Sequence, residues 1–287
     1  MKLALGTVQF GSIYGVSNTS GQVPTIEVAG ILSRARSLGI DMLDTAAAYG
    51  DSEAVLGEVG AEGFRVISKI PPFPNCRTDM ACWVEGIVEN SITKLKVQFL
   101  DGILMHRPLE LLEPGGRDAY DEMLRLKECG LVKKIGVSIS QPKDLDLLME
   151  YFDFDIVQAP MNLFDRRLET SGWLRKLNSQ GVEVHIRSIF LQGLLLMPAD
   201  DRPAYFTPWR TLFDQLDLWL NNNHLTALQG CLGYIQQFSE VSRFIVGVDS
   251  LAHLNEVSEA AAGVLEHVPD SFSSDDLKLI NPALWRL

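Results

Sequence analysis

Residues 43–53 read Leu-Asp-Thr-Ala-Ala-Ala-Tyr-Gly-Asp-Ser-Glu, and no other stretch says as much about the architecture of this chain. Residues 40–43 form a short apolar run typical of a strand, whereas residues 52–60 have the periodicity of a helix. Asp44 therefore ends a strand, and Tyr49 lies in the strand-to-helix loop that follows. In a barrel of parallel strands, such loops form the rim where reactive groups collect. A carboxylate and a phenol at this rim indicate proton transfer.

Apolar runs alternate with helical segments from one end of the chain to the other. Strands are expected at residues 3–6, 40–44, 65–70, 100–106, 132–138, 155–159, 182–188 and 244–248. Helices are expected at residues 25–38 (capped by Thr25), 52–59, 79–95, 120–128, 142–150, 170–179 and 251–262. Strict alternation implies a parallel sheet. Eight repeats in 287 residues predict the α/β class and a closed (β/α)₈, or TIM, barrel.

An open, doubly wound sheet is the alternative architecture. Its usual marker is G-x-G-x-x-G after the first strand. Residues 6–11 follow that position here and read Gly-Thr-Val-Gln-Phe-Gly, which does not fit the marker. We therefore prefer the barrel, as a single domain over residues 1–287.

One interval breaks the alternation, because a long insertion separates the last two expected strands. It contains a proline-rich, irregular segment at residues 191–208 and two helices at residues 210–222 and 226–238. A long insertion at this rim typically acts as a lid or substrate loop. The apolar candidates for such a lid are Phe190, residues 194–196, Tyr205, Phe206 and Trp209, with Phe10, Tyr14 and Trp83 expected nearby.

The bulk composition excludes several classes of protein. Hydrophobic residues make up 46% and charged residues 22%, which excludes a disordered chain. A net charge of −12 argues against a nucleic-acid partner and against an anionic membrane surface. Residues 1–6 do not resemble a signal peptide, and no apolar run approaches the ~18 residues that span a bilayer. We expect a cytoplasmic protein with reduced thiols at Cys76, Cys82, Cys129 and Cys231.

Four polar residues converge at three adjacent strand ends. Asp44, Lys69 and His106 end the second, third and fourth expected strands, and Tyr49 follows Asp44. Adjacent parallel strands lie about 4.8 Å apart, so these side chains can form one cluster. Each residue alone could be a helix cap, a solvated lysine, a hydrogen-bonded histidine or a packing aromatic. Their convergence on one rim indicates a site.

The chemistry that suits this set is specific. A tyrosine with a pKa near 10 is a poor acid unless a neighbouring cation favours its phenolate, and Lys69, held by Asp44, can supply that charge. Tyr49 could then protonate a carbonyl oxygen that His106 orients through a second hydrogen bond. The set contains no obvious acyl-transfer nucleophile and no metal site. Protonating a carbonyl in this way requires a hydride donor, which is usually a nicotinamide cofactor.

These residues carry a resemblance to the aldo-keto reductases, a family of (β/α)₈ nicotinamide-dependent oxidoreductases. The matching segments, in family order and spacing, are residues 6–11, 43–46, 49–53, 68–69, 104–106, 134–138, 157–158 with Asn162 and Asp165, and 245–247. By this resemblance Asp44, Tyr49, Lys69 and His106 match the catalytic tetrad, with Tyr49 as general acid/base. The resemblance implies a small-molecule carbonyl or alcohol substrate, such as an aldehyde, ketone or sugar.

The resemblance also implies a cofactor site. The positions that match it are Gly6, Thr7, Asp44, Ser138, Gln158, Arg187, Ser188, Gly247, Ser250, His253 and Glu256. Ser138 and Gln158 match residues that bind the nicotinamide carboxamide, whereas the asparagine usual after that serine is Ile139. Arg187 replaces the aromatic residue that usually stacks on the nicotinamide, and Ser188 begins the pyrophosphate-binding loop.

The adenosine end of this cofactor site follows the last strand. NADP-selective members usually carry Lys or Arg there for the 2′-phosphate, but this chain offers only His253, and Asp249 would repel a phosphate. The family's Glu-Asn ending is Glu256-Val257 here. The family's habit implies NADP, and NAD is the alternative.

Two other functions remain open at this point. One is a nicotinamide-binding regulatory or accessory protein with weak turnover, as in the potassium-channel β subunits of the same family. The other is a barrel lyase that uses Lys69 as a Schiff base, which the neighbouring Asp44 opposes because the lysine would have to be neutral. The sequence specifies no oligomeric state.

Overall fold

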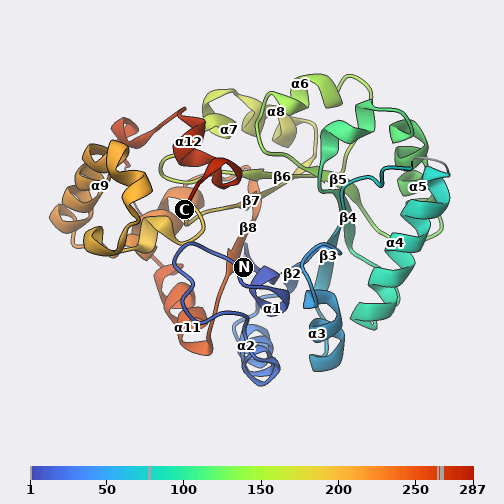
Figure 1. Cartoon of the computed structure of the whole chain (residues 1–287), viewed down its shortest axis with the longest axis horizontal. Helices are drawn as coiled ribbons and strands as arrows, with labels where there is room; N and C mark the ends of the chain where they lie inside the picture. The colour runs from blue at the N-terminus through green and yellow to red at the C-terminus, as the bar shows by residue number, and fades with distance from the viewer. Residues whose placement is uncertain (1, 77–78, 264, 266–267) are drawn as a thin grey trace.

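Eight parallel strands close into a barrel in chain order in the computed structural model, which describes residues 2–76, 79–263, 265 and 268–287 (Figure 1). The strands are β1 Leu3–Gly6, β2 Met42–Asp44, β3 Arg65–Ile70, β4 Gly102–Met105, β5 Ile135–Ser138, β6 Ile156–Pro160, β7 Glu183–Arg187 and β8 Val241–Gly247. The α-helices are α1 Val8–Gly11, α2 Thr25–Ser37, α3 Ser52–Val59, α4 Met80–Leu95, α5 Gly116–Glu128, α6 Asp144–Leu148, α7 Arg167–Thr170, α8 Trp173–Ser179, α9 Arg210–Asn222, α10 Ala227–Gln236, α11 Leu251–Ala260 and α12 Leu277–Ile280. The prediction of a closed (β/α)₈ barrel is confirmed.

The barrel interior is built in layers by the two-residue period of the strands. One buried layer is apolar and consists of Ala4, Met42, Ile67, Leu104, Ile156 and Ile245. Two positions further along the same strands, toward the carboxyl rim, come Gly6, Asp44, Lys69, His106, Gln158 and Gly247. The apolar layer therefore forms the floor beneath a polar layer that contains the predicted site.

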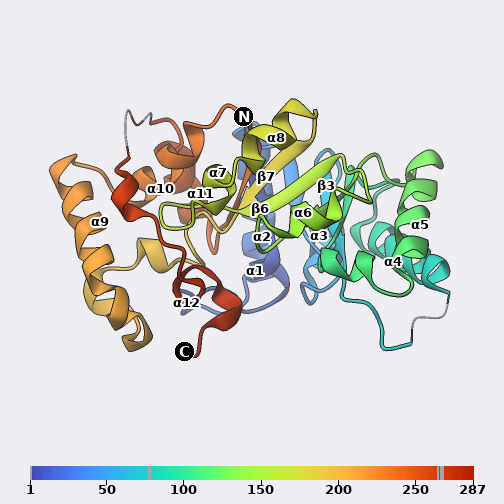
Figure 2. The ribbon, with the colours of Figure 1, turned by 90° about the horizontal axis from the view of Figure 1, so that it is seen from above.

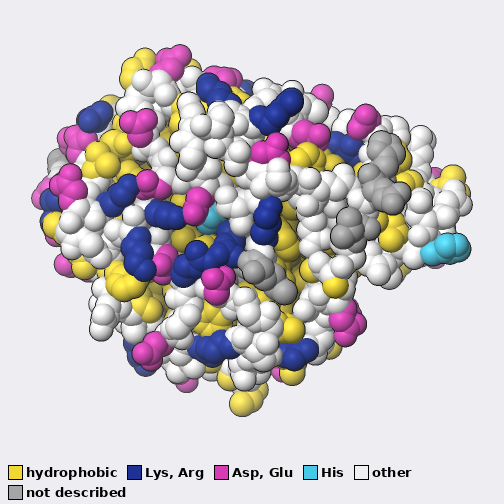
Figure 3. Space-filling model, turned by 180° about the vertical axis from the view of Figure 1, so that it is seen from behind, with side chains coloured by type: hydrophobic (Ala, Val, Ile, Leu, Met, Phe, Trp, Pro, Cys, Tyr) yellow, Lys and Arg dark blue, Asp and Glu magenta, His cyan; other side chains and the backbone are white. Residues whose placement is uncertain are grey.

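The opposite end of the barrel carries several ion pairs. Asp41 accepts from Arg65 at 2.6 Å and pairs with Arg243 at 3.3 Å, and Lys134 pairs with Glu183 at 2.6 Å. Figure 3 shows the face turned away from the view of Figure 1, with basic and acidic side chains interspersed across it. The charges of these pairs lie at the amino ends of the strands and neutralise one another. The pocket lies at the other end of the barrel, at the carboxyl ends of the strands.

The long insertion lies between β7 and β8, as predicted. It consists of three short 3₁₀ segments, η2 Leu194–Leu196, η3 Ala199–Asp201 and η4 Ala204–Trp209, followed by α9 and α10. Figure 2 shows α9 at the outer edge of the molecule, with α10 between it and α11. In the described ranges, no helix combines the length and apolar character needed to cross a membrane.

One predicted helix cap and two predicted helix boundaries are wrong. Helix α2 is not capped by Thr25, because Pro24 takes the N-cap position in extended conformation and Thr25 is the first helical residue. Helix α5 begins at Gly116 rather than at residue 120, after Gly115 with a φ of 83°. The helix expected at 170–179 is two helices, α7 and α8, separated where Gly172 adopts a φ of 80°. Glycine reaches this left-handed conformation without strain, so it interrupts a helix that periodicity alone predicts as continuous.

Candidate active site

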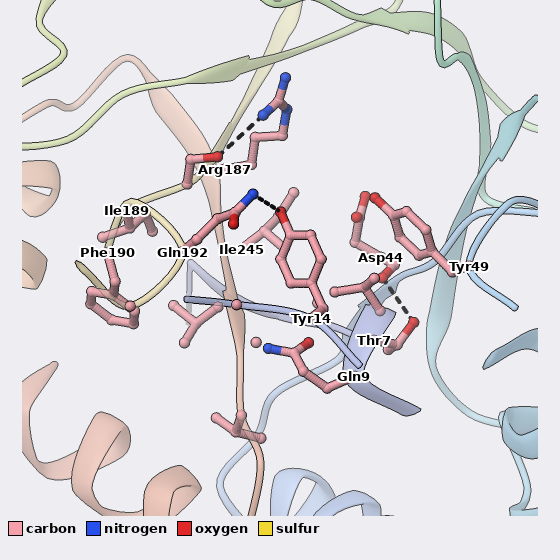
Figure 4. A pocket seen from close by; sticks show the side chains of 18 of the residues that line it. Thr7, Gln9, Tyr14, Asp44, Tyr49, Arg187, Ile189, Phe190, Gln192 and Ile245 are labelled. Carbon is pink, nitrogen blue, oxygen red and sulfur yellow. Dashed lines mark hydrogen bonds between the residues drawn. The ribbon is translucent and has the colours of Figure 1, made fainter. Parts of the chain in front are cut away.

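A pocket of about 950 Å³ opens at the carboxyl ends of the strands. Figure 4 shows Tyr14, Tyr49 and Arg187 lying around it. The predicted site residues that line it are Gly6, Thr7, Asp44, Tyr49, His106, Ser138, Arg187, Ser188, Gly247, His253 and Glu256. Lys69 and Gln158 are fully buried beneath these lining residues. Ser250 is not among the lining residues. Its hydroxyl caps α11 by accepting from the His253 backbone N–H at 3.1 Å.

The floor of the pocket holds a buried ion pair. Lys69 Nζ donates to Asp44 Oδ1 at 2.6 Å and to the Thr45 carbonyl at 2.8 Å. Gln158 Nε2 donates to Asp44 Oδ2 at 2.6 Å, and Ser138 Oγ donates to Gln158 Oε1 at 3.1 Å. Both carboxylate oxygens of Asp44 therefore accept strong hydrogen bonds, which fixes the lysine and connects it to β5 and β6.

Lys69 keeps its proton despite complete burial. Burial by itself would lower the pKa of this lysine, but the charge of Asp44, together with Tyr49 and the hydrogen bonds to both, outweighs burial and raises it. The site therefore presents a permanent cation at its floor.

Tyr49 lies directly above this cation. The Lys69 ammonium is 4.9 Å from the centre of the Tyr49 ring, and the His106 ring meets Tyr49 edge to face at 5.8 Å. A phenol, an ammonium and an imidazole thus share one end of the pocket, as the strand-end positions predicted. This arrangement can deliver a proton to a bound oxygen and stabilise the charge left behind.

Close backbone packing explains why the loop that carries Tyr49 has its particular sequence. Gly50 has a φ of 54°, and a side chain on it would collide with the Gly11 backbone. A side chain on Gly11 would collide in turn with the Tyr49 carbonyl. Ser52 Oγ donates to the Thr7 carbonyl at 2.8 Å, so the loop is fastened to the end of β1. The motif at 43–53 therefore serves mainly to hold Asp44 and Tyr49 in place.

His106 is neutral at physiological pH. Burial lowers its pKa to about 4, and the positive charges of Lys69 and Arg187 act in the same direction. A neutral imidazole has one N–H to donate, which suits a hydrogen bond to a carbonyl oxygen.

This lowered pKa predicts a pH-dependent stability. As the pH falls from about 6.5 to about 4, the unfolded chain takes up a proton at His106 before the folded chain does. The contribution of neutral His106 to the free energy of unfolding is therefore complete above this window and is lost progressively within it. Urea unfolding at several pH values should show that the free energy of unfolding declines through this window. In the His106→Gln variant this pH-dependent decline should be smaller. An NMR titration that protonates His106 near pH 6.5 would contradict the assignment.

Two buried polar atoms on the other side of the pocket lack hydrogen-bond partners. Within the described chain, Gln9 Oε1 and Asp249 Oδ1 are buried and accept no hydrogen bond, and both residues line the pocket. The Gln9 amide occupies the space that a side chain at Gly247 would need. Buried acceptors are normally satisfied, so these two point to a ligand that brings donors.

The loop after β7 shapes the same side of the pocket. Ser188, Leu191, Gln192 and Gly193 all have positive φ values, between 48° and 90°. Arg187 is fixed beside this loop, because it donates to Ser188 Oγ at 3.2 Å and to the Ile139 carbonyl at 2.9 Å. Ile139 thus anchors Arg187 through its backbone, a role independent of its side chain.

These features fit a nicotinamide dinucleotide. The pocket is large enough for such a ligand, and the unpartnered acceptors are suited to ribose hydroxyl or amide donors. Gln9 and Arg107 line the pocket but were missed by sequence reasoning, since neither stands at the end of a strand. Among described residues, no three His, Cys, Asp or Glu side chains are grouped to hold a metal ion.

Several residues expected around the substrate lie elsewhere. Phe206 is buried and packs edge to face on Trp285 at 4.9 Å, and Trp209 donates to Asp276 Oδ2 at 3.1 Å. Tyr205 donates to the Lys278 carbonyl at 3.0 Å. The prediction that these three aromatic residues shape the pocket is wrong, because the C-terminal segment packs on them instead. Phe10 and Trp83 do not line the pocket either, whereas Tyr14, Phe190 and Leu196 do.

The chain is similar in sequence to a known protein family and to several curated proteins. A family model described as the aldo/keto reductase family matches residues 2–270. The aldo-keto reductase YhdN of Bacillus subtilis (strain 168) is 28% identical over 183 residues, covering 59% of this chain and 53% of that protein. The uncharacterized oxidoreductase YtbE of the same strain is 31% identical over 165 residues, covering 55% and 57% respectively. The chain thus spans about half the length of the curated relatives it matches.

One solved structure extends the likeness to nearly the whole fold. The aldo-keto reductase AKR11C1 from Bacillus halodurans, in its holo form, matches with a TM-score of 0.74 at 18% identity. The match covers 93% of this chain and 87% of that one. At this level of identity, the likeness concerns the barrel architecture.

Proposed function

Because this chain belongs to the aldo/keto reductase family, we propose that it is an NAD(P)-dependent oxidoreductase that interconverts carbonyl compounds and alcohols. The observation that carries the proposal is the buried Lys69–Asp44 ion pair beneath Tyr49, with neutral His106 beside it. A small-molecule carbonyl compound, such as an aldehyde, ketone or sugar, is the substrate.

The four residues have separate tasks in this proposal. When bound, the reduced nicotinamide cofactor supplies the hydride that becomes the new C–H bond of the alcohol. Tyr49 transfers its phenolic proton to the carbonyl oxygen, and the Lys69 ammonium stabilises the negative charge that develops on the Tyr49 oxygen. Asp44 holds Lys69 in position, and His106 donates a hydrogen bond that orients the carbonyl. In the alcohol-oxidising direction, the Tyr49 phenolate accepts the alcohol proton.

The cofactor is held by the remaining residues of the predicted set. Ser138 binds the nicotinamide carboxamide, and Gln158 positions Ser138 from beneath by accepting its hydroxyl at 3.1 Å. Arg187 covers the nicotinamide ring, and Ser188 with the following loop binds the pyrophosphate. Gly6, Thr7, Gly247, His253 and Glu256 complete the site, and Ser250 contributes indirectly by capping the helix α11 that carries His253 and Glu256. The raised pKa of Lys69 argues against the lyase alternative, because a protonated amine cannot form a Schiff base.

We propose NAD rather than NADP as the form used by this chain. The resemblance to the family alone implies NADP. The carboxylate oxygen of Asp249 that lacks a partner in the described chain instead favours a ribose hydroxyl, as in NAD, over the 2′-phosphate of NADP. Burial also raises the pKa of Asp249 above its ordinary value, as expected for a carboxyl group with an oxygen that accepts no hydrogen bond in the described chain. Among the described residues that line the pocket from β8 and α11, His253 is the only basic one, and Glu256 adds a second carboxylate.

Asp249→Arg is expected to shift the ratio of NADPH to NADH affinity toward NADPH by about tenfold or more, since a repulsive charge becomes attractive. Dissociation constants from tryptophan fluorescence titration measure this shift without turnover. Asp249→Asn, which removes the charge and keeps the shape, should give an intermediate ratio. Wild-type protein that binds NADPH more tightly than NADH would contradict the assignment.

The proposed function is tested by incubating the purified protein with NADH or NADPH and a panel of aldehydes, ketones and sugars. Consumption of cofactor with formation of the corresponding alcohol supports it. Tight cofactor binding without turnover on any member of the panel would instead support the regulatory alternative.

A further inference from the structure

The charges that line the pocket are unevenly distributed. Arg107 and Arg187 line it, and neither forms an ion pair with a carboxylate in the described part of the chain. Asp44 is one of the four proposed catalytic residues, and its negative charge is already neutralised by the Lys69 ammonium at 2.6 Å. The catalytic end therefore carries an excess of positive charge, in a protein whose net charge is −12.

The negative residues of the pocket lie across the barrel from Arg107. Asp249 and Glu256 line the pocket after β8, whereas Arg107 follows β4. In a closed barrel of eight strands in chain order, β4 and β8 stand on opposite sides. The proposed cofactor residues lie at the ends of β5 to β8 and of β1 and β2, and none of them lies at the end of β4. Arg107 therefore lies on the side left for the substrate.

Arg107 is the arginine that remains available. The Arg187 guanidinium is committed to the Ile139 carbonyl at 2.9 Å and to Ser188 Oγ at 3.2 Å. Arg107 is exposed at the pocket mouth, and among the described residues its side chain makes neither a hydrogen bond nor an ion pair. Arg107 directly follows His106 in the chain. Besides burial, the positive charge of Arg107, like that of Arg187, lowers the pKa of His106, so Arg107 lies close to the catalytic end of the pocket.

We propose that the substrate is a carbonyl compound that carries an anionic group, a carboxylate or a phosphate, and that Arg107 binds this group at the pocket mouth. The proposal rests on the function proposed above and names its substrate class. A guanidinium offers two parallel N–H donors that match the oxygens of either anion. Since the protein as a whole repels anions, such a substrate requires local capture of this kind.

The test compares matched pairs of aldehydes. One pair is 4-carboxybenzaldehyde and its neutral methyl ester, and the other is glyceraldehyde 3-phosphate and glyceraldehyde. Wild-type protein should show the higher kcat/KM for the anionic member of at least one pair, and the pair that responds identifies the anion. Arg107→Gln should lower the anionic-to-neutral ratio by about 10- to 100-fold, the effect of losing a hydrogen bond to a charged group.

Two further variants sharpen the result. Arg107→Glu should lower the ratio beyond the Gln variant, because it places a negative charge where the anion binds. Arg175→Gln removes an exposed arginine of α8 that does not line the pocket, and it should leave the ratio unchanged. Equal ratios in wild-type and Arg107→Gln protein would overturn the proposal.

A binding measurement separates this proposal from the reductase function. The dissociation constant of terephthalate, an unreactive dicarboxylate, is measured by fluorescence on protein saturated with oxidised cofactor. Arg107→Gln should weaken this binding by about tenfold or more. If no aldehyde is reduced but Arg107 still controls terephthalate binding, the reductase function fails and the anion site stands. If aldehydes are reduced and terephthalate binds equally to both proteins, the anion site fails alone.

Discussion

Replacing Tyr49 by phenylalanine is expected to lower kcat for carbonyl reduction by a factor of about 10² to 10⁴, the usual contribution of a positioned general acid. Phenylalanine keeps the ring that packs edge to face on His106 and covers Lys69, so only the proton-donating hydroxyl is lost. The dissociation constant of the cofactor should therefore stay close to the wild-type value. Single-turnover reduction with excess enzyme measures the chemical step, and fluorescence titration measures cofactor binding.

Tyr14→Phe is the matched control for this experiment. Tyr14 also lines the pocket, but its hydroxyl accepts from Gln192 Nε2 at 3.3 Å and lies in the loop after α1 rather than over the ion pair. Its loss should cost much less activity than the loss of the Tyr49 hydroxyl. A Tyr49→Phe protein that consumes cofactor as fast as wild type would remove Tyr49 from its assigned role.

The positions of the proposed catalytic residues could be predicted from the sequence because a simple geometric rule governs them. The two-residue period of a strand fixes which side chains face the barrel interior, and the last inward position of each strand lies at the rim. Asp44 and Lys69 occupy that position on β2 and β3, and His106 directly follows the last residue of β4. Each lies two residues after a member of the apolar layer, Met42, Ile67 and Leu104 respectively. Local patterns were sufficient here because neighbouring strands follow one another in the chain.

The failed predictions concern contacts between distant segments. Tyr205, Phe206 and Trp209 have the composition of a substrate lid, but they pack on residues near the C-terminus, about seventy positions away in sequence. No local pattern reports such a contact. Gln9 and Arg107 were missed for a related reason. Within the described ranges, Gln9 has an oxygen that accepts no hydrogen bond and Arg107 has no ion-pair partner, and only the folded surroundings reveal either fact.

Replacing Lys69 by methionine is expected to abolish measurable turnover and to lower the free energy of unfolding by about 3–5 kcal/mol, because it leaves the Asp44 carboxylate buried without its counter-ion. Among the described residues, only Gln158 Nε2, at 2.6 Å, would then still donate to the Asp44 carboxylate. The double variant Lys69→Met with Asp44→Asn removes both charges, so it should recover most of the lost stability but none of the activity. Urea unfolding followed by far-ultraviolet circular dichroism measures the stability. If the single variant proves as stable as wild type, the ion pair does not have the buried character on which the proposed proton transfer depends.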